Sequence, residues 1–187
     1  FTFSGASSRQ RLAKFSSSGT LNAWIKHANS TVTSLAILNS SSRLLAGGYF
    51  TTIGSTTSQY IAKLITTDNT NAPVSGWNPE PNGNVNAILV DGGKVYFGSV
   101  GDGKAYCLDA ATGTVLWTFP TEGPVRLAPT IAGGKAYFGS DDGCVYCTDA
   151  GTGALVWKFR AAPEEHRVLG NGFLISLWPV RTGDASQ

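Results

Sequence analysis

Apolar and polar residues alternate along short stretches of this chain, and glycine-containing turn sequences separate the stretches. In the clearest unit, residues 85–119, the turn sequences Asp91-Gly92-Gly93 and Gly101-Asp102-Gly103 interrupt the alternation. A period of two is typical of half-buried β-strands, and glycine allows the positive φ angles of tight hairpins. The strands expected in this unit are 85–90, 94–99, 104–109 and 114–119.

The same pattern recurs with a period near forty residues. Trp77, Trp117 and Trp157 lie 40 residues apart, and the segments 109–117 and 149–157 are near-copies of each other. The strands expected in the following unit are 125–131, 135–140, 144–149 and 154–159, and those in the looser preceding unit are 32–38, 43–50, 60–64 and 74–77. Four antiparallel strands in each unit of about forty residues predict an all-β fold, a β-propeller built of four-stranded blades.

The two ends of the chain predict how the ring of blades is completed. Residues 1–15 align with residues 50–64, so the chain begins in the second strand of a blade. Residues 172–180 have the pattern of a first strand, and sharing one blade between the termini leaves no unpaired strand edge. We therefore predict one domain of four blades closed by strand sharing. The blades are 32–77, 85–119, 125–159, and a fourth made of 1–26 plus 172–180, in which 21–26 form the last strand.

Two other arrangements fit the same repeats. In one, the chain is half of an eight-bladed ring that a second chain or further sequence completes. In the other, the array of blades stays open. Closure within the chain predicts a monomer, whereas a ring completed by a second copy predicts a homodimer.

The two halves of the chain carry different repeat types. Residues 90–160 resemble the quinoprotein-type (PQQ-like) propeller repeat, because the segments 106–117 and 146–157 follow its Ala-x-Asp-x-x-Thr-Gly-x-x-x-Trp pattern except beside the aspartates. Residues 1–89 resemble the delta-60 propeller repeat, through the segments 11–24 and 45–64. A chain that joins both types is either a natural mosaic or a recombinant.

The PQQ-like resemblance implies eight blades and, in the dehydrogenases of that family, a quinone cofactor with a calcium ion over the ring centre. Only two blades of this chain match the repeat well. The sequence also contains no D-x-[DN]-x-[DN]-G calcium loop. We therefore expect no cofactor and no metal, with PQQ and calcium as the alternative.

Several repeat residues are expected to be structural. The aspartates accept hydrogen bonds from turn amides, and the glycines take the left-handed position. The tryptophans lie on outer strands, where they cover the gap to the next blade, and burying each ring is worth roughly several kcal/mol. These residues are Asp109, Gly113, Trp117, Asp149, Gly153, Trp157 and Trp77.

Composition narrows the functions open to such a fold. The 187-residue chain is 14% charged with a net charge of +2, which argues against a nucleic-acid-binding protein. It has no long apolar run, so we expect no transmembrane segment. Low charge and abundant serine and threonine favour a periplasmic or extracellular location.

Three cysteines raise the question of a metal or redox site. Cys144 and Cys147 form a CxxC sequence, and Cys107 holds the repeat position of Cys147. In a strand, residues three apart face opposite sides, and four metal ligands are not in view. We predict structural thiols.

The longest connector, residues 160–167, is the best candidate for a binding site. In a propeller such connectors gather on one face around the central channel, and loops carry binding function more often than strands do. The predicted binding residues are Glu122, Arg126, Glu164, Glu165, His166, Arg167 and Trp178. The alternative is a solvated charged loop, and we predict no catalytic residue.

These inferences predict a non-enzymatic β-propeller scaffold or binding module, whose ligand is a protein or a small molecule. One alternative is a fragment of a PQQ-dependent dehydrogenase-like enzyme. The other is a self-assembling, engineered or mosaic propeller without evolved activity.

Overall fold

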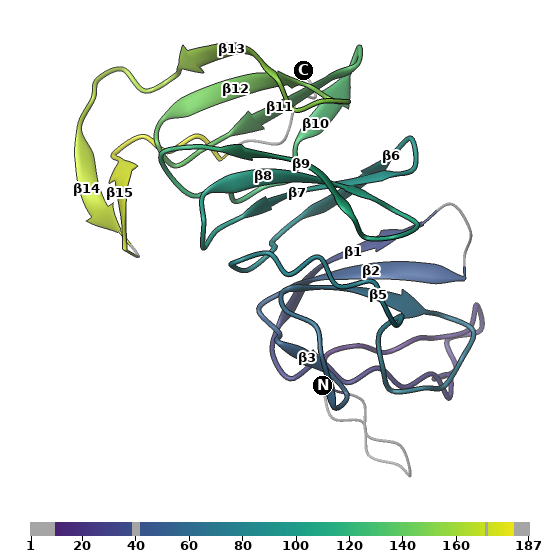
Figure 1. Cartoon of the computed structure of the whole chain (residues 1–187). Helices are drawn as coiled ribbons and strands as arrows, with labels where there is room; N and C mark the ends of the chain where they lie inside the picture. Colours follow the sequence, from purple (N-terminus) through teal and green to yellow (C-terminus); the bar gives the residue numbers. More distant parts are fainter. Residues whose placement is uncertain (1–9, 39–41, 171, 182–187) are drawn as a thin grey trace.

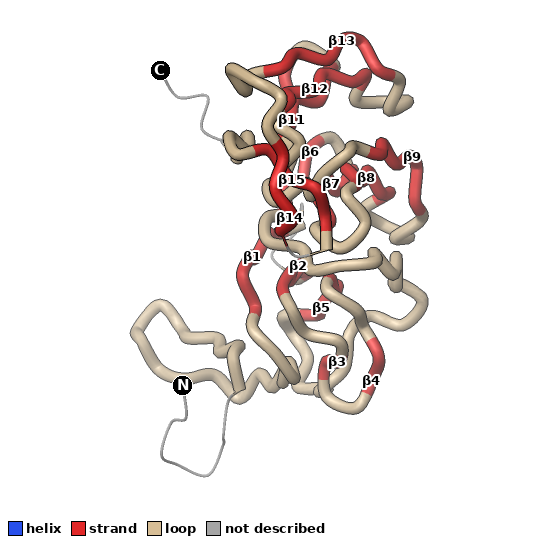
Figure 2. Tube along the Cα trace, turned by 90° about the vertical axis from the view of Figure 1, so that its left-hand side faces the viewer, coloured by secondary structure: helices blue, strands red, loops and turns tan. Residues whose placement is uncertain are grey.

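Strands and turns make up the part of the chain that the computed structural model describes, residues 10–38, 42–170 and 172–181. No helix occurs within those residues, and each pair of strands is antiparallel (Figure 2). The all-β prediction is therefore confirmed. Since the described part has no helix at all, none there is able to cross a membrane.

The first sheet has the order β1-β2-β5. Its strands are β1 (Val32–Ile37), β2 (Arg43–Gly48) and β5 (Ile61–Ile65), and the hairpin of β3 (Thr52–Ile53) and β4 (Thr56–Thr57) lies between β2 and β5 in the chain. The expected fourth strand, 74–77, is not formed. Only the amide of Val74 reaches the sheet, donating to the Lys63 carbonyl at 2.7 Å. Pro73 beside it has no amide to continue the ladder.

The second and third sheets each contain four strands in chain order. The second is β6 (Ile88–Asp91), β7 (Lys94–Ser99), β8 (Lys104–Asp109) and β9 (Val115–Pro120). The third is β10 (Thr130–Ala132), β11 (Lys135–Gly139), β12 (Cys144–Asp149) and β13 (Leu155–Arg160). The first strands are shorter than predicted because their beginnings press on the preceding sheet. A Cβ on Gly98 would lie 2.4 Å from the Val125 carbonyl oxygen, so only glycine allows this approach.

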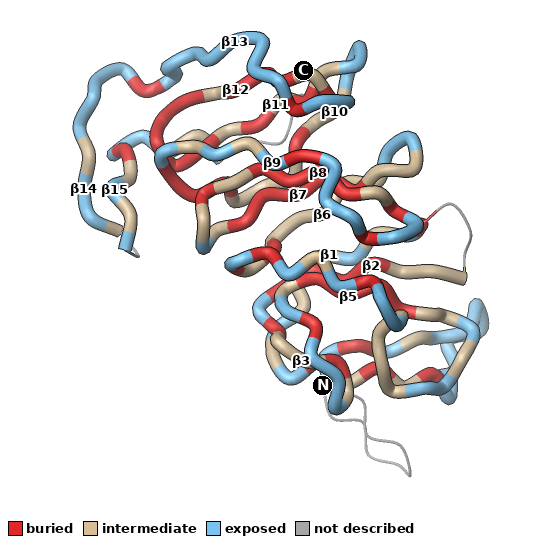
Figure 3. Tube along the Cα trace, viewed as in Figure 1, coloured by how far each residue is buried: buried red, intermediate tan, exposed pale blue. Residues whose placement is uncertain are grey.

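The sheets stack one on another, and a hydrophobic core lies between each pair of layers (Figures 1 and 3). Trp24 packs with Leu64 between the N-terminal segment and the first sheet. Leu45 belongs to the core that also holds Phe97 of the second sheet. Cys107 belongs to the core shared with the third sheet. Burying each large apolar side chain contributes about 1.5–3 kcal/mol, so these cores hold the layers together.

The ends of the described chain lie at opposite ends of this stack (Figures 1 and 2). Residues 10–28 lie against the first sheet, with isolated bridges between Phe15 and Leu21 and between Ala28 and Ile53. They form no regular strand at 21–26. The N-terminal part of the predicted shared blade, residues 1–9, lies outside the described residues.

The C-terminal segment differs from its expected role as a first strand. β15 (Phe173–Ser176) forms a hairpin with β14 (Arg167–Gly170). The chain then returns to the third sheet, where the amide of Val180 donates to the Ser140 carbonyl at 3.1 Å. Closure of a ring by strand sharing is not confirmed, and it stays a prediction.

Candidate functional site

The turn before each outer strand has the same construction in the second and third sheets. Asp109 Oδ1 accepts hydrogen bonds from the amide and the hydroxyl of Thr112 at 2.7 and 2.8 Å. Asp149 Oδ1 accepts from the amide and hydroxyl of Thr152 at 2.8 and 2.9 Å. The amide hydrogen bonds are the main reason why the pKa of each carboxyl lies below its usual value. Both carboxylates therefore stabilise a turn through these hydrogen bonds.

Tryptophans cover these turns from the preceding sheet. A Cβ placed on Gly113 would lie 3.0 Å from the ring of Trp77, and one on Gly153 would lie 2.7 Å from the ring of Trp117. Both glycines have positive φ, 79° and 74°. The indole nitrogen of Trp117 donates to the Ala150 carbonyl in the same turn at 3.1 Å. We call this contact, a tryptophan of one repeat on the glycine turn of the next, a seam.

Lys63 and Trp24 make further hydrogen bonds between neighbouring layers. Lys63 donates to the Ala110 carbonyl at 2.9 Å. Trp24 Nε1 donates to the Ile65 carbonyl at 2.7 Å. Burial is the main reason why the pKa of the Lys63 ammonium lies below its usual value. The seams are therefore polar as well as apolar, and they are structural contacts.

A buried carboxylate organises the end of the third sheet where the chain returns. Asp141 is fully buried and lies between two guanidinium groups. Arg126 Nε donates to Asp141 Oδ2 at 2.6 Å, and Arg181 Nε donates to Oδ1 at 2.9 Å. The Asp141 carbonyl accepts from the Ser176 amide at 2.7 Å. Asp141 thereby ties the C-terminal segment to the sheet.

The neighbouring carboxylate, Asp142, accepts hydrogen bonds from its own turn and from the connector at Glu122. It accepts hydrogen bonds from the Tyr146 hydroxyl at 2.5 Å, the Cys144 amide at 2.9 Å and the Glu122 amide at 3.2 Å. Burial and this carboxylate raise the pKa of Tyr146 far above its usual range. Both carboxylate oxygens of Asp141 and of Asp142 thus accept hydrogen bonds from protein groups.

Exposed ion pairs surround this end of the sheet. Arg167 donates to Glu122 at 2.6 Å and to Glu165 at 3.0 Å, and Lys158 lies 3.3 Å from Glu122. The hydrogen bond from Arg167 is the main reason why the pKa of Glu122 is lowered. Glu165 also pairs with Arg160 at 3.2 Å. The structure thus brings together Glu122, Glu165 and Arg167.

The remaining predicted binding residues lie beside this cluster. His166 Nδ1 is 3.1 Å from Glu164 Oε2, and its ring lies 6.2 Å from that of Trp178. Arg126 faces Asp141, as described above, and not the ion pairs around Glu122.

The β14–β15 hairpin presents apolar side chains to solvent next to these charges. Leu169 is 78% exposed and Leu174 is 56% exposed, and Val168 is also exposed. In the described part of the chain, β14 and β15 pair as strands only with each other. The amide of Ser176, at the end of β15, donates to the Asp141 carbonyl of the third sheet. Figure 1 shows the hairpin standing off from the stacked sheets. We call Leu169 and Leu174, which face the same side of the hairpin, the hairpin patch.

Sequence reasoning missed Asp141, Arg181 and the hairpin patch. Comparing the repeats could have drawn attention to Asp141, because the second sheet has Gly101 where the third has this aspartate. Nothing in the sequence marks the hairpin patch, because apolar and polar residues alternate around it as they do in any half-buried strand.

The cysteines and carboxylates do not form a metal or cofactor centre among the described residues. Cys107, Cys144 and Cys147 are free and buried, and burial raises the pKa of Cys107 to about 11. Within residues 10–38, 42–170 and 172–181, no three His, Cys, Asp or Glu side chains form a group that could hold a metal ion. The donors present therefore do not fit the calcium of a quinone site.

A cleft opens between the first strands of the second and third sheets. Residues 87–91 and 127–131 line it. Most of its side chains are apolar, and Asp91 is the one acid among its lining residues. It offers no acid–base pair for catalysis.

Comparisons with known proteins place the chain in a family. A family model described as outer membrane protein assembly factor BamB matches residues 66–175, more than half of the chain. No curated protein sequence matches the chain. The match confirms the predicted PQQ-like repeats. The delta-60 resemblance of residues 1–89 stays a prediction.

Three solved structures share the fold. BamB from Moraxella catarrhalis has a TM-score of 0.58 at 22% identity, over 81% of this chain and 44% of that one. The computationally designed Ika8 protein gives 0.55 at 16% identity, over 82% and 47%. The computationally designed Ika4 protein gives 0.54 at 18% identity, over 73% and 77%. The β-propeller prediction is confirmed, and this chain spans less than half of the first two structures.

Proposed function

We propose, from the premise that this chain belongs to the family of the outer membrane protein assembly factor BamB, that it is a non-enzymatic β-propeller module that binds another protein. The family description also supports a periplasmic or envelope location. The binding face we propose is the end of the third sheet that carries the hairpin patch and the ion pairs around Glu122.

The hairpin patch is the observation that carries this proposal. A group of exposed apolar side chains on one hairpin is typical of protein-binding surfaces. Leu169 and Leu174 lie directly opposite each other in the β14–β15 register. Their side chains therefore form one apolar surface.

Charged and aromatic groups beside the hairpin patch suit a protein ligand. Arg167, at the start of β14, pairs with Glu122 and Glu165. Trp178 is 41% exposed after β15. An apolar centre with a charged rim and an aromatic side chain is the usual composition of protein interfaces. Aromatic side chains and arginine carry much of the binding energy there.

A photo-crosslinking experiment tests the proposal. A photoreactive amino acid at position 169 should capture one defined protein in the envelope of the source cell. The matched control is position 115, where exposed Val115 lies on the outer strand of the second sheet.

Binding of the captured protein, once purified, is then measured by calorimetry. Leu169→Asp with Leu174→Asp should weaken it about tenfold or more, since buried leucines at an interface are worth 1 kcal/mol or more. Equal capture at positions 169 and 115, or unchanged affinity of the double variant, would overturn the proposal.

A further inference from the structure

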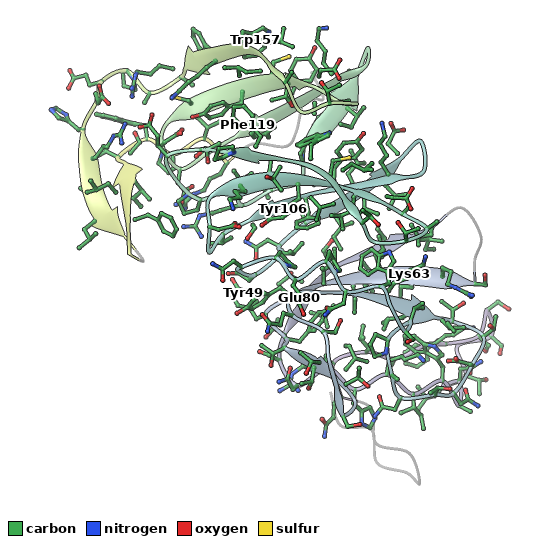
Figure 4. All side chains as sticks on the ribbon, in the orientation of Figure 1. Tyr49, Lys63, Glu80, Tyr106, Phe119 and Trp157 are labelled. Atoms are coloured by element: carbon green, nitrogen blue, oxygen red, sulfur yellow. The ribbon has the colours of Figure 1, made fainter. Side chains whose placement is uncertain are left out.

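The outer strand of the third sheet exposes aromatic side chains that are covered in the second sheet. Trp117 is 7% exposed, whereas the equivalent Trp157 is 42% exposed. Phe119 lies against the ring of Phe138 in the next sheet at 5.8 Å, whereas Phe159 is 62% exposed. Figure 4 shows Phe119 between two sheets and Trp157 at the end of the stack.

The rest of the strand does not change in this way. Val115 and Leu116 are 42% and 46% exposed, and the equivalent Leu155 and Val156 are 51% and 48% exposed. The difference is therefore confined to the two side chains that face the following sheet.

Contacts within each sheet are also the same. The Trp117 ring lies 6.0 Å from Tyr96, and the Trp157 ring lies 6.0 Å from Tyr137. Trp157 therefore has the position of a seam tryptophan, and among the described residues no glycine turn lies under its ring.

A glycine turn without a covering ring lies at the other end of the stack. Gly19 has φ 79°, like Gly113, and a Cβ placed on it would meet no atom within 4 Å. The amide of Ser16 donates to the Thr20 carbonyl at 2.9 Å, and the amide of Gly19 donates to the Ser16 carbonyl at 3.0 Å.

The covered turn has the same hydrogen bonds. The amide of Asp149 donates to the Ala154 carbonyl, and the amide of Gly153 donates to the Asp149 carbonyl, both at 2.8 Å. The turn at 16–20 is one residue shorter but keeps the positive-φ glycine that a seam requires.

We propose that these two ends are complementary halves of one further seam, formed between two copies of this chain. Trp157 of one copy covers the Gly19 turn of the second copy, and its indole N–H donates to a carbonyl of that turn, as Trp117 does with Ala150. Phe159 is buried at the same junction. The partner is a second copy because the two ends lie at opposite ends of one stack (Figures 1 and 2).

Two such junctions close a ring of two chains. Each copy contributes one Trp157 end and one Gly19 end, so the pair uses both ends of both copies and exposes no further seam. A head-to-tail contact of this kind closes when its rotation permits and otherwise grows without limit. This inference goes beyond the proposed protein-binding face, which lies on the β14–β15 hairpin and not in the junction.

Light scattering of single variants begins the test. The wild-type chain should have twice its mass of 19.6 kDa. Trp157→Glu and Gly19→Arg should each raise the dimer dissociation constant about thirty-fold or more, the scale of a tryptophan lost from an interface centre. Ser18→Arg tests the same turn without a positive-φ substitution. The control, Leu155→Glu, changes an exposed residue outside the seam and should leave the dimer intact.

Mixing two variants supplies the decisive result. Neither Trp157→Glu nor Gly19→Arg alone retains an intact junction. A mixture of the two retains one, between the intact Trp157 of one chain and the intact Gly19 turn of the other. The mixture should therefore associate at concentrations where each variant alone is a monomer.

Three outcomes would overturn the proposal. They are a wild-type mass of one chain at every concentration, a mass that grows beyond that of two chains as concentration rises, and a mixture that stays monomeric. Circular dichroism that matches the wild type shows that each variant is folded, so loss of the dimer is not loss of the fold.

Discussion

The outer strands β9 and β13 have similar sequences and similar places in their sheets. Only β9 has a following sheet packed against it. Trp117 packs on Gly153 and donates to Ala150. Trp157 keeps the contact within its sheet and lacks the one to a following sheet. In a repeat protein, the contribution of a residue to stability therefore depends on the next repeat as much as on its own repeat.

The two sheets also differ at the turn between their middle strands. The third sheet places Asp141 where the second has Gly101. In the second sheet, Gly101 lies so close to Asn82 that a Cβ would be 2.0 Å from its carbonyl oxygen. In the third sheet, a carboxylate there binds two arginines. The same turn position thus serves close packing in one sheet and attachment of the C-terminal segment in the other.

The largest expected difference comes from removing each tryptophan in turn. Trp117→Ala should lower the free energy of unfolding by about 3–5 kcal/mol, because it empties a buried seam. Trp157→Ala should cost about 1 kcal/mol in dilute protein, where its outer face is solvated. Urea unfolding measures both values. The two costs should approach each other as protein concentration rises, and equal costs in dilute protein would contradict the seam assignment.

Alanine substitutions at Gly19 and Gly153 separate the cost of the tryptophan contact from the cost of the backbone conformation. Gly19→Ala should cost about 1–2 kcal/mol, the penalty of a left-handed conformation for a residue with a Cβ. Gly153→Ala carries the same penalty and adds a contact of 2.7 Å with the Trp117 ring. Overpacking of this kind costs about 1–3 kcal/mol more. Thermal unfolding of both variants gives the difference, and an equal loss would show that Trp117 does not cover the turn.

Asp141→Gly converts the third-sheet turn into its second-sheet counterpart. The variant should lose about 1–2 kcal/mol, since Arg126 and Arg181 are partly exposed and regain water when their partner is removed. Residues 176–181 should exchange their amide hydrogens faster, because the side-chain tie to the sheet is gone. Hydrogen exchange measures this, with the second sheet as the internal control that stays unchanged.

Acid should weaken both turns alike, which is the smallest of these effects. The pKa values of Asp109 and Asp149 are lowered in the folded chain. Their stabilisation is therefore present above the unfolded value of 3.8 and is lost as the pH falls through the folded values. Asp149→Asn should flatten part of this decline in thermal unfolding. A steeper decline in the variant would contradict the role of this carboxylate.

Local features of the fold follow from the sequence, and long-range ones do not. The predicted strands 94–99 and 104–109 coincide with β7 and β8, because alternation and glycine turns act over a few residues. The expected strand at 74–77 is absent. The segment before it is held by Lys26, whose ammonium donates to the Ala72 carbonyl at 3.2 Å across 46 positions of sequence. No local pattern contains that contact.

The candidate site shows the same limit. The charged connector around Arg167 could be recognised from its residue types, and its role in binding stays a prediction. The hairpin patch could not be recognised, because its exposure depends on β15 pairing with β14 and not with a neighbouring sheet. Burial of Asp141 depends on the returning C-terminal segment, which sequence alone does not place.

Oxidative footprinting of the tryptophan rings tests the seam account most directly. Hydroxyl radicals modify accessible side chains, and peptide mass spectrometry reads Trp117 and Trp157 separately. We expect Trp117 to be protected at every protein concentration, and Trp157 to be oxidised in dilute protein and protected in concentrated protein. Equal oxidation of the two rings at all concentrations would contradict the account.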